Sequence, residues 1–270
     1  MSKLNAIKTF RDLLSFLTII PVGAKEDFVL TSAEHLYLFP LIGGFIGLLG
    51  AFYFLASSFV VSGLLGVIGL VVQVPAGFVL QLVPTAMTLA FLLVLTGLQH
   101  FDGLVDLGNA VGMRSVHERK MVAHAWTVTY SGAFLALAVE LLVFAGLFFL
   151  NPLFAFGGII AAEVAAKLAM VTIVWIGKLT HKGLGSIFLA KAKKKLNIVA
   201  YVISVLIVYP FLGFLGVGIV LVSVPVAVLM EKVAESVFGG VSGDMIGATN
   251  EVARAVTLIL LAVVFMLVLV

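Results

Sequence analysis

The stretch 97–112 (GLQHFDGLVDLGNAVG) places two carboxylates and an amide at a spacing suited to binding a metal ion. On a helix, Asp102, Asp106 and Asn109 stand at positions i, i+4 and i+7 and therefore share one face. Like charges one turn apart destabilise a helix unless a cation lies between them. Mg²⁺ is commonly bound by one or two carboxylates together with substrate phosphates. The stretch therefore predicts a Mg²⁺ site, with a solvated helix end as the alternative.

A second stretch, 239–254 (GGVSGDMIGATNEVAR), joins a glycine-rich turn to a helix. The free N–H groups at the start of such a helix can bind an anion. Asp244 and Glu251 stand at i and i+7, again on one face of the expected helix. The alternative is structural, with Asp244 capping the helix and Glu251 paired with Arg254.

Further charged residues have both a functional and a structural interpretation. Lys178 and His181, in WIGKLTHKGLGSIF (175–188), suit either a substrate phosphate or anionic lipid head groups. Glu163, Lys167 and Glu140 fall inside apolar segments, where ionisable residues usually line a cavity or pair with one another. Lys167 is expected either to reach substrate phosphates or to form a closed ion pair with Glu163.

The composition predicts that a membrane bundle positions these groups. The chain has 270 residues, of which 63% are hydrophobic and 11% charged, and its mean hydropathy is +1.27. Soluble domains carry about 25% charged residues. Several uncharged runs exceed the roughly 20 residues of a membrane-spanning helix, and they lack the alternation of membrane strands. The absence of cysteine excludes thiolate metal sites, thiol catalysis and disulfides.

The predicted fold is all-α, a polytopic bundle of seven transmembrane helices in a single domain, 1–270. The predicted spans are 39–61, 77–99, 132–150, 153–177, 197–210, 212–230 and 252–270. Residues 62–76 are expected to form an outer re-entrant piece or an eighth helix. Residues 1–34 are expected to form an N-terminal segment with a helix lying in the membrane interface, and a signal peptide is the alternative.

The charged residues predict the orientation of the bundle. They fall into four clusters, at 3–34, 102–120, 178–195 and 231–254. The expected hairpins between them are uncharged and lie at Gln73–Pro75, Asn151–Pro152 and Tyr209–Gly213. Positive charge is retained on the cytoplasmic side. We therefore expect a cell-membrane protein with its N-terminus and site cytoplasmic and its C-terminus outside.

Several motifs resemble those of a known family. HFDGLVDLGNA (100–110) resembles the H-x-D-G-L-x-D-x-x-D signature of the cobalamin 5'-phosphate synthase family, the adenosylcobinamide-GDP ribazoletransferases. The resemblance extends over nearly the whole chain, through FLTIIPV (16–22), FPLIGGFIG (39–47), HKGLGSIF (181–188) and GGVSGDMIGATNE (239–251). The family has Asp where this chain has Asn109. A neutral amide can ligate a metal through oxygen but adds no charge, so we expect weaker metal binding.

The resemblance implies a membrane enzyme of late cobamide assembly that uses Mg²⁺. Its substrates would be adenosylcobinamide-GDP and α-ribazole or its 5'-phosphate, with GMP released. Membrane lipid is the expected surrounding, no nucleic acid is expected, and the oligomeric state stays open. The candidate residues are catalytic Asp102, Asp106, Asp244 and Glu251; metal-binding Asp102, Asp106, Asn109 and Asp244; and substrate-binding His100, Asn109, Arg114, Arg119, Lys167, Lys178, His181, Gly239, Gly240, Gly243 and Asn250. The alternatives are another metal-dependent phosphotransferase, of the phospholipid alcohol type, and a transporter.

Overall fold

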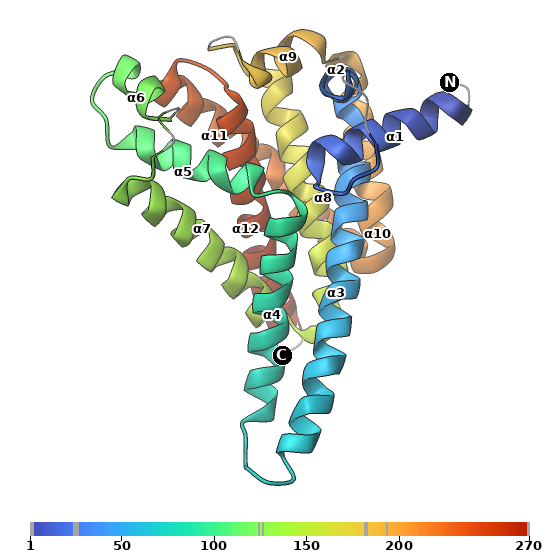
Figure 1. The fold of residues 1–270 in the computed structure, drawn as a ribbon. Coiled ribbons are helices and arrows are strands. Elements are labelled where there is room, and N and C mark those ends of the chain that lie inside the picture. The colour runs from blue at the N-terminus through green and yellow to red at the C-terminus, as the bar shows by residue number, and fades with distance from the viewer. Residues whose placement is uncertain are drawn as a thin grey trace.

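The computed structural model describes residues 3–23, 27–123, 125, 127–180, 183–192 and 194–268. In these ranges the chain is helical, and the pairing outside helices is one isolated bridge between Leu179 and Val241. The predicted all-α architecture is confirmed (Figure 1). The helices are α1 Lys3–Leu17, α2 Phe28–Glu34, η1 Leu36–Leu38, α3 Phe39–Ile68, α4 Ala76–Leu95, α5 Gln99–Val111, α6 Val116–Ala123, α7 Tyr130–Phe149, α8 Pro152–Ile176, α9 Leu184–Lys191, η2 Lys194–Leu196, α10 Ile198–Leu221, α11 Ser223–Phe238 and α12 Gly243–Val268.

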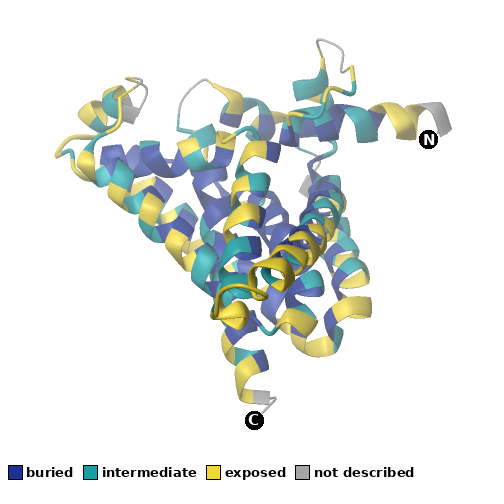
Figure 2. Cartoon of the chain, turned by 60° about the horizontal axis from the view of Figure 1, so that its bottom comes forward, coloured by how far each residue is buried: buried dark blue, intermediate teal, exposed yellow. Residues whose placement is uncertain are grey.

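In the part of the chain that the structure describes, six helical segments are long and apolar enough to cross a membrane, which confirms the predicted polytopic bundle. They are Leu36–Ile68, Ala76–Leu95, Tyr130–Phe149, Pro152–Ile176, Ile198–Phe238 and Gly243–Leu267. Many large apolar side chains on their outer faces are exposed, for example Phe59 at 82% and Phe214 at 81% (Figure 2). Such an apolar outer surface suits lipid rather than water.

The fifth of these segments passes along the bundle twice. Its beginning lies at the carboxyl end of α8, where the Tyr201 and Thr172 hydroxyls are 2.8 Å apart. Farther along, Phe211 lies against Gly157, near the start of α8. The backbone then turns at Gly213 (φ 60°, ψ −157°), and α11 ends beside the carboxyl end of α8 again. Within the described residues, the six segments therefore make seven passes through the bundle, with a hairpin at the predicted position.

Three predicted boundaries are wrong. Residues 62–68 continue α3, and 69–75 form a connection, so no eighth helix is present there. An apolar surrounding favours this continuation because it leaves backbone groups no partner except the helix itself. The last apolar span begins at Gly243 rather than at 252, because its charged residues are paired inside the protein, although the helix itself starts at the glycine-rich turn as expected. The second span ends at Leu95, where a sharp turn separates α4 from α5.

The central helix of the bundle is α8, which packs against α3, α10, α11 and α12 (Figure 1). Glycines on α3 let it approach closely. A Cβ built on Gly43 would lie 2.6 Å from the Glu163 carbonyl oxygen, and one on Gly47 would lie 2.6 Å from the Ile160 Cα. Small residues at a helix interface allow this kind of packing in membranes. The close fit fixes the position of Glu163 deep in the protein.

The amino-terminal helices lie across one end of the bundle (Figure 1). Leu13, Leu14 and Leu17 of α1 are buried, whereas Ile7 is 70% exposed. The predicted N-terminal helix is therefore present, and its position in a membrane interface stays a prediction. Helices α2, α6 and α9 lie at the same end as α1, whereas the α3–α4 connection lies at the opposite end (Figure 1).

Candidate active site

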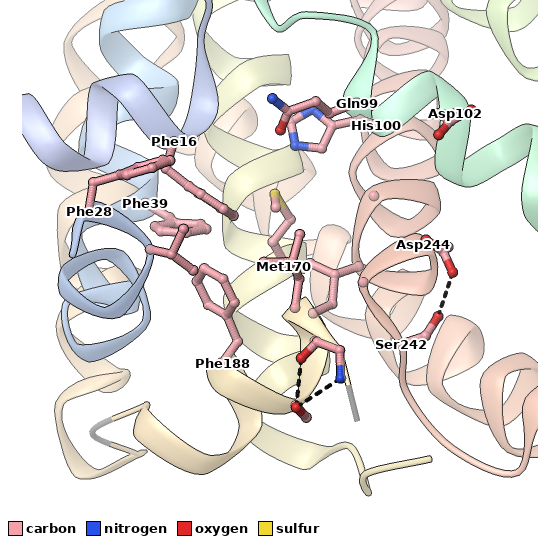
Figure 3. Close-up of a pocket in the computed structure, with 18 of the residues that line it drawn as sticks. Phe16, Phe28, Phe39, Gln99, His100, Asp102, Met170, Phe188, Ser242 and Asp244 are labelled. Carbon is pink, nitrogen blue, oxygen red and sulfur yellow. Dashed lines mark hydrogen bonds between the residues drawn. The ribbon is translucent and has the colours of Figure 1, made fainter. Parts of the chain in front are cut away.

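A cavity of about 660 Å³ opens at the end of the bundle where α1, α2 and α9 lie (Figure 3). Its volume is in the range of sites for small organic molecules. Six helices contribute to its wall: α1, α2, α3, α5, α8 and α12. Helix α9 and the residue before it close one side. The lining residues are Ser15, Phe16, Phe28, Val29, Phe39, Gln99, His100, Asp102, Met170, Gly183, Leu184, Gly185, Ser186, Phe188, Ser242, Gly243, Asp244, Ile246 and Gly247.

A left-handed turn aims α5 at this cavity. Gly97 (φ 65°) and Leu98 (φ 59°) are both left-handed, and Leu98 is a costly residue in that conformation. The turn ends α4 and starts α5 in a new direction, so Gln99, His100 and Asp102 face the cavity (Figure 3). Asp102, Asp106 and Asn109 lie on one helix, as predicted, but this helix is not a continuation of the second span, and of the three only Asp102 lines the cavity.

The start of α12 forms the facing part of the polar wall. Gly239 (φ 75°) and Gly240 (φ 151°) adopt conformations that favour glycine. The Val241 N–H donates to the Lys178 carbonyl (2.7 Å), which fastens this turn to the end of α8. The Ser242 hydroxyl donates to Asp244 Oδ2 (3.3 Å) and accepts from the Met245 N–H (3.3 Å). The helix therefore begins at the cavity with its capping group in place.

Two glycines bring α5 and α12 into backbone contact. A Cβ on Gly103 would lie 2.5 Å from the Asp244 carbonyl oxygen, and one on Gly247 would lie 3.2 Å from the His100 Cα. Asp102 and Asp244 consequently line one cavity, as the predicted common site requires. Burial, and then the charges of Asp244 and Asp102, raise the pKa of the half-buried Asp106 to about 7.

Two carboxylates on this cavity, with a third close by, form a donor set that fits Mg²⁺. Mg²⁺ takes oxygen ligands and is usually held by one or two carboxylates plus substrate phosphates. Among the described residues, no group of three or more His, Asp or Glu is placed to hold a metal ion. Asp102 and Asp244 thus present carboxylate oxygens, the ligand type that Mg²⁺ takes, to one cavity.

Asn109 has a structural task instead of the predicted place in the metal site. Its Oδ1 accepts hydrogen bonds from the Thr129 N–H (2.9 Å) and hydroxyl (2.7 Å). Its Nδ2 donates to the Thr127 carbonyl (2.8 Å), and the residue is fully buried. Both lone pairs of the oxygen are used. Asn109 thus fixes the start of α7 against α5.

Two predicted substrate-binding residues, Lys167 and Asn250, and the predicted catalytic Glu251 are also buried away from the cavity, in a network of charges between α8 and α12. The Lys167 ammonium donates to Glu163 Oε2 (3.0 Å) and to Asn250 Oδ1 (2.9 Å). Asn250 Nδ2 donates in turn to Glu251 Oε1 (3.0 Å). Arg254 completes the network, with its Nε 2.7 Å from Glu163 Oε1 and its Nη1 bonded to Glu251 Oε2. All of these side chains are fully buried.

This geometry favours the structural interpretation of Lys167, Asn250 and Glu251, because a buried charge needs its partners. Glu251, predicted as catalytic, is held by Arg254. His100 lies between the network and the cavity: it lines the cavity, and its Nδ1 is 4.0 Å from Glu251 Oε1. Burial, and then the charges of Lys167 and Arg254, hold the pKa of His100 well below its usual value. His100 is therefore a neutral hydrogen-bonding group at the cavity wall.

Of the remaining predicted residues, Gly243 lines the cavity, and the others lie outside it or outside the described residues. Arg119 Nε donates to the Met113 carbonyl (2.9 Å) and its Nη1 to the Ser236 carbonyl (2.9 Å). Arg114 is exposed, and Lys178 pairs with Glu235 at 2.9 Å; this hydrogen bond and the Glu235 charge raise the lysine pKa. Gly239 and Gly240 shape the turn but do not line the cavity, whereas Gly243 does. His181 lies outside the described residues.

Sequence reasoning missed the apolar half of the cavity, which consists mainly of Phe16, Phe28, Phe39 and Phe188. These residues come from four different helices. Phe16, Phe39 and Phe188 fall in stretches that resemble the family, but nothing in the sequence shows that they meet Phe28 in space.

Comparison with known proteins gives a consistent family. The sequence profile described as cobalamin-5-phosphate synthase matches residues 9–262. A protein named adenosylcobinamide-GDP ribazoletransferase from Methanocella arvoryzae is 30% identical, covering 94% of this chain and 95% of its own. Proteins of the same name from Halorubrum lacusprofundi and Thermococcus onnurineus are also 30% identical. Each alignment covers 93% of this chain, together with 95% of the Halorubrum protein and 96% of the Thermococcus protein. No solved structure matches the chain. The profile match and these near-full-length relatives together show that the chain belongs to the cobalamin-5-phosphate synthase family.

Proposed function

We propose that this protein is an adenosylcobinamide-GDP ribazoletransferase of late cobalamin biosynthesis. It joins adenosylcobinamide-GDP to α-ribazole or α-ribazole 5'-phosphate and releases GMP. The names of the family members support this function over another phosphotransferase or a transporter. The observation that carries the proposal is that the two motifs resembling the family, one on α5 and one on α12, meet at one cavity.

The chemistry is a phosphoryl transfer. A hydroxyl oxygen of the ribazole bonds to the phosphorus attached to the cobinamide, and the bond from that phosphorus to the GMP oxygen breaks. The hydroxyl proton passes to solvent or to a carboxylate of the cavity. Such reactions proceed largely through positioning and charge stabilisation, so a strong base is not required.

We assign the positioning to the polar wall. Asp102 and Asp244 would hold Mg²⁺ against the substrate diphosphate, with Asp106 one helical turn along. Bound there, the metal would offset the negative charge of the phosphates. The start of α12, with its Gly243 N–H, faces the same cavity and suits an anionic oxygen. His100, kept neutral, can donate one hydrogen bond without adding charge.

The test is a GMP-release assay on purified protein with both substrates. We expect GMP release that requires the nucleoside and Mg²⁺ and that stops on chelation. Binding of Mn²⁺, followed by its electron paramagnetic resonance signal, should tighten when a guanosine diphosphate ester is present. GMP release that is independent of the nucleoside, or none at all, would contradict the proposed transferase.

A further inference from the structure

The apolar half of the cavity is a wall of four phenylalanine rings from four helices (Figure 3). Phe16 of α1 lies with its ring centroid 4.9 Å from that of Phe188 on α9, 6.1 Å from that of Phe39 on α3 and 6.4 Å from that of Phe28 on α2. The Phe39 and Phe188 centroids are 5.9 Å apart. These are the separations of interacting aromatic pairs, so the four rings form one continuous cluster.

The rings of the cluster differ in exposure. Phe39 and Phe188 are buried, at 0% and 3% exposed, whereas Phe16 and Phe28 are half-buried. Phe39 and Phe188 therefore support the wall from behind, and Phe16 and Phe28 present ring surface to the cavity. The polar side chains on this side are those of Ser15 and Ser186. Ser186 is occupied, because its hydroxyl donates to the Gly183 carbonyl (2.6 Å) and accepts from the Gly183 N–H (3.1 Å).

Opposite this wall stand Asp102, Ser242 and Asp244 (Figure 3). One cavity thus joins an aromatic side to a polar side, which suits a molecule with a flat apolar ring at one end and hydroxyl or phosphate oxygens at the other. A volume of about 660 Å³ holds a nucleoside or its monophosphate whole. A corrinoid bearing a nucleotide is far larger and must extend beyond the cavity.

We propose that the phenylalanine wall binds the base of the acceptor nucleoside and that it selects a flat, apolar base. This inference rests on the proposed function. A benzimidazole base stacks on Phe16 and Phe28 and loses no hydrogen bonds there. A purine carries donors and acceptors on its edges, and burying them against phenylalanine without partners is unfavourable. The same reasoning excludes the guanine of the donor substrate from this wall.

The first experiment measures steady-state GMP release by the full-length protein. Phe16→Leu and Phe28→Leu remove ring surface while keeping apolar volume. We expect each to raise the KM for α-ribazole by about five- to 100-fold, the range for loss of one base–aromatic stack. The KM for adenosylcobinamide-GDP should stay unchanged. Phe10→Leu is the matched control, because Phe10 lies on the same helix but packs against Phe45 (5.8 Å between centroids) and not on the cavity.

A second comparison uses the wild-type protein with two acceptors that differ only in the base. We expect kcat/KM for the benzimidazole nucleoside to exceed that for the adenine nucleoside at least about tenfold. For the Phe16→Leu and Phe28→Leu variants, a rise in the KM for adenosylcobinamide-GDP, with the KM for the nucleoside unchanged, would place the donor substrate on the wall and overturn the inference. Equal kcat/KM for the two acceptors would also overturn it. So would a KM for α-ribazole in Phe16→Leu and Phe28→Leu that matches that of Phe10→Leu.

Equilibrium binding of α-ribazole without the donor separates this inference from the proposed function. If the wild type binds the nucleoside and Phe16→Leu binds it at least about fivefold more weakly, the subsite stands even where no GMP is released. If the wild type binds no α-ribazole, the inference fails whatever the outcome of the transferase assay.

Discussion

At the scale of single residues, the carboxylates of the cavity differ from those inside the bundle. Asp102 and Asp244 line the cavity, whereas Glu163 and Glu251 are fully buried and paired with Lys167 and Arg254. The two groups should therefore respond differently to neutralisation. Loss of a cavity carboxylate should impair the reaction, and loss of a network charge should impair folding.

Asp102→Asn tests the cavity carboxylates. The variant keeps the shape of the side chain but removes the charge that would hold a metal against the phosphates. We expect GMP release to fall about 100-fold or more, with the folded fraction unchanged. Glu231→Gln, the same neutralisation on α11 away from the cavity, is the control and should retain activity. Full activity of Asp102→Asn at limiting Mg²⁺ would contradict the metal assignment.

Lys167→Met tests the network. Removing this cation takes away the hydrogen bond that Lys167 donates to the buried Glu163 carboxylate. It also takes away the hydrogen bond that Lys167 donates to the Asn250 amide oxygen. We expect a loss of about 3–5 kcal/mol in unfolding free energy, seen as a lower melting temperature in detergent, with near-normal activity per folded molecule. The double variant with Glu163→Gln should recover part of this loss. An unchanged melting temperature with weaker binding of adenosylcobinamide-GDP would instead restore Lys167 as a substrate ligand.

At the scale of helices, the site depends on how closely α5 approaches α12. Gly103 meets the Asp244 carbonyl oxygen directly, so Gly103→Ala should push the helices apart and separate the two cavity carboxylates. We expect a cost of about 1–3 kcal/mol in stability and a larger loss of GMP release. Gly63→Ala on α3 is the matched control, since nothing lies within 4 Å of its added Cβ. Equal activity of the two variants would show that this approach is not needed.

At the scale of the whole molecule, helices α1, α2, α6 and α9 gather at one end of the bundle (Figure 1), and α1, α2 and α9 line the cavity there. We expect this end to face the cytoplasm, because positive charge is retained there. The chain has no cysteine, so single-cysteine variants report cleanly. Gln73→Cys should react with an impermeant thiol reagent from outside intact cells, and Lys195→Cys only after lysis. The reverse pattern would invert the orientation.

The sequence by itself determined the class of the protein, its family and most of its passes. Long runs without charged residues predict membrane spans, because a charged side chain is costly inside a bilayer. The hairpins at Asn151–Pro152 and Gly213 follow from breaks in those runs. Motif residues such as Asp102 and Asp244 could be identified as candidates because polar groups are conspicuous in an apolar chain.

Only the tertiary structure decided which candidates share a cavity. Lys167 and Glu251 have the residue types of a phosphate site, yet they pair with groups on neighbouring helices, and periodicity along one helix cannot show such partners. The turn at Leu98, which aims Asp102 at the cavity, also has no sequence signal, because leucine rarely adopts a left-handed conformation. The phenylalanine wall was likewise hidden. Three of its residues, Phe16, Phe39 and Phe188, lie in motifs that resemble the family, but only the packing of four helices shows that they meet Phe28 at one cavity.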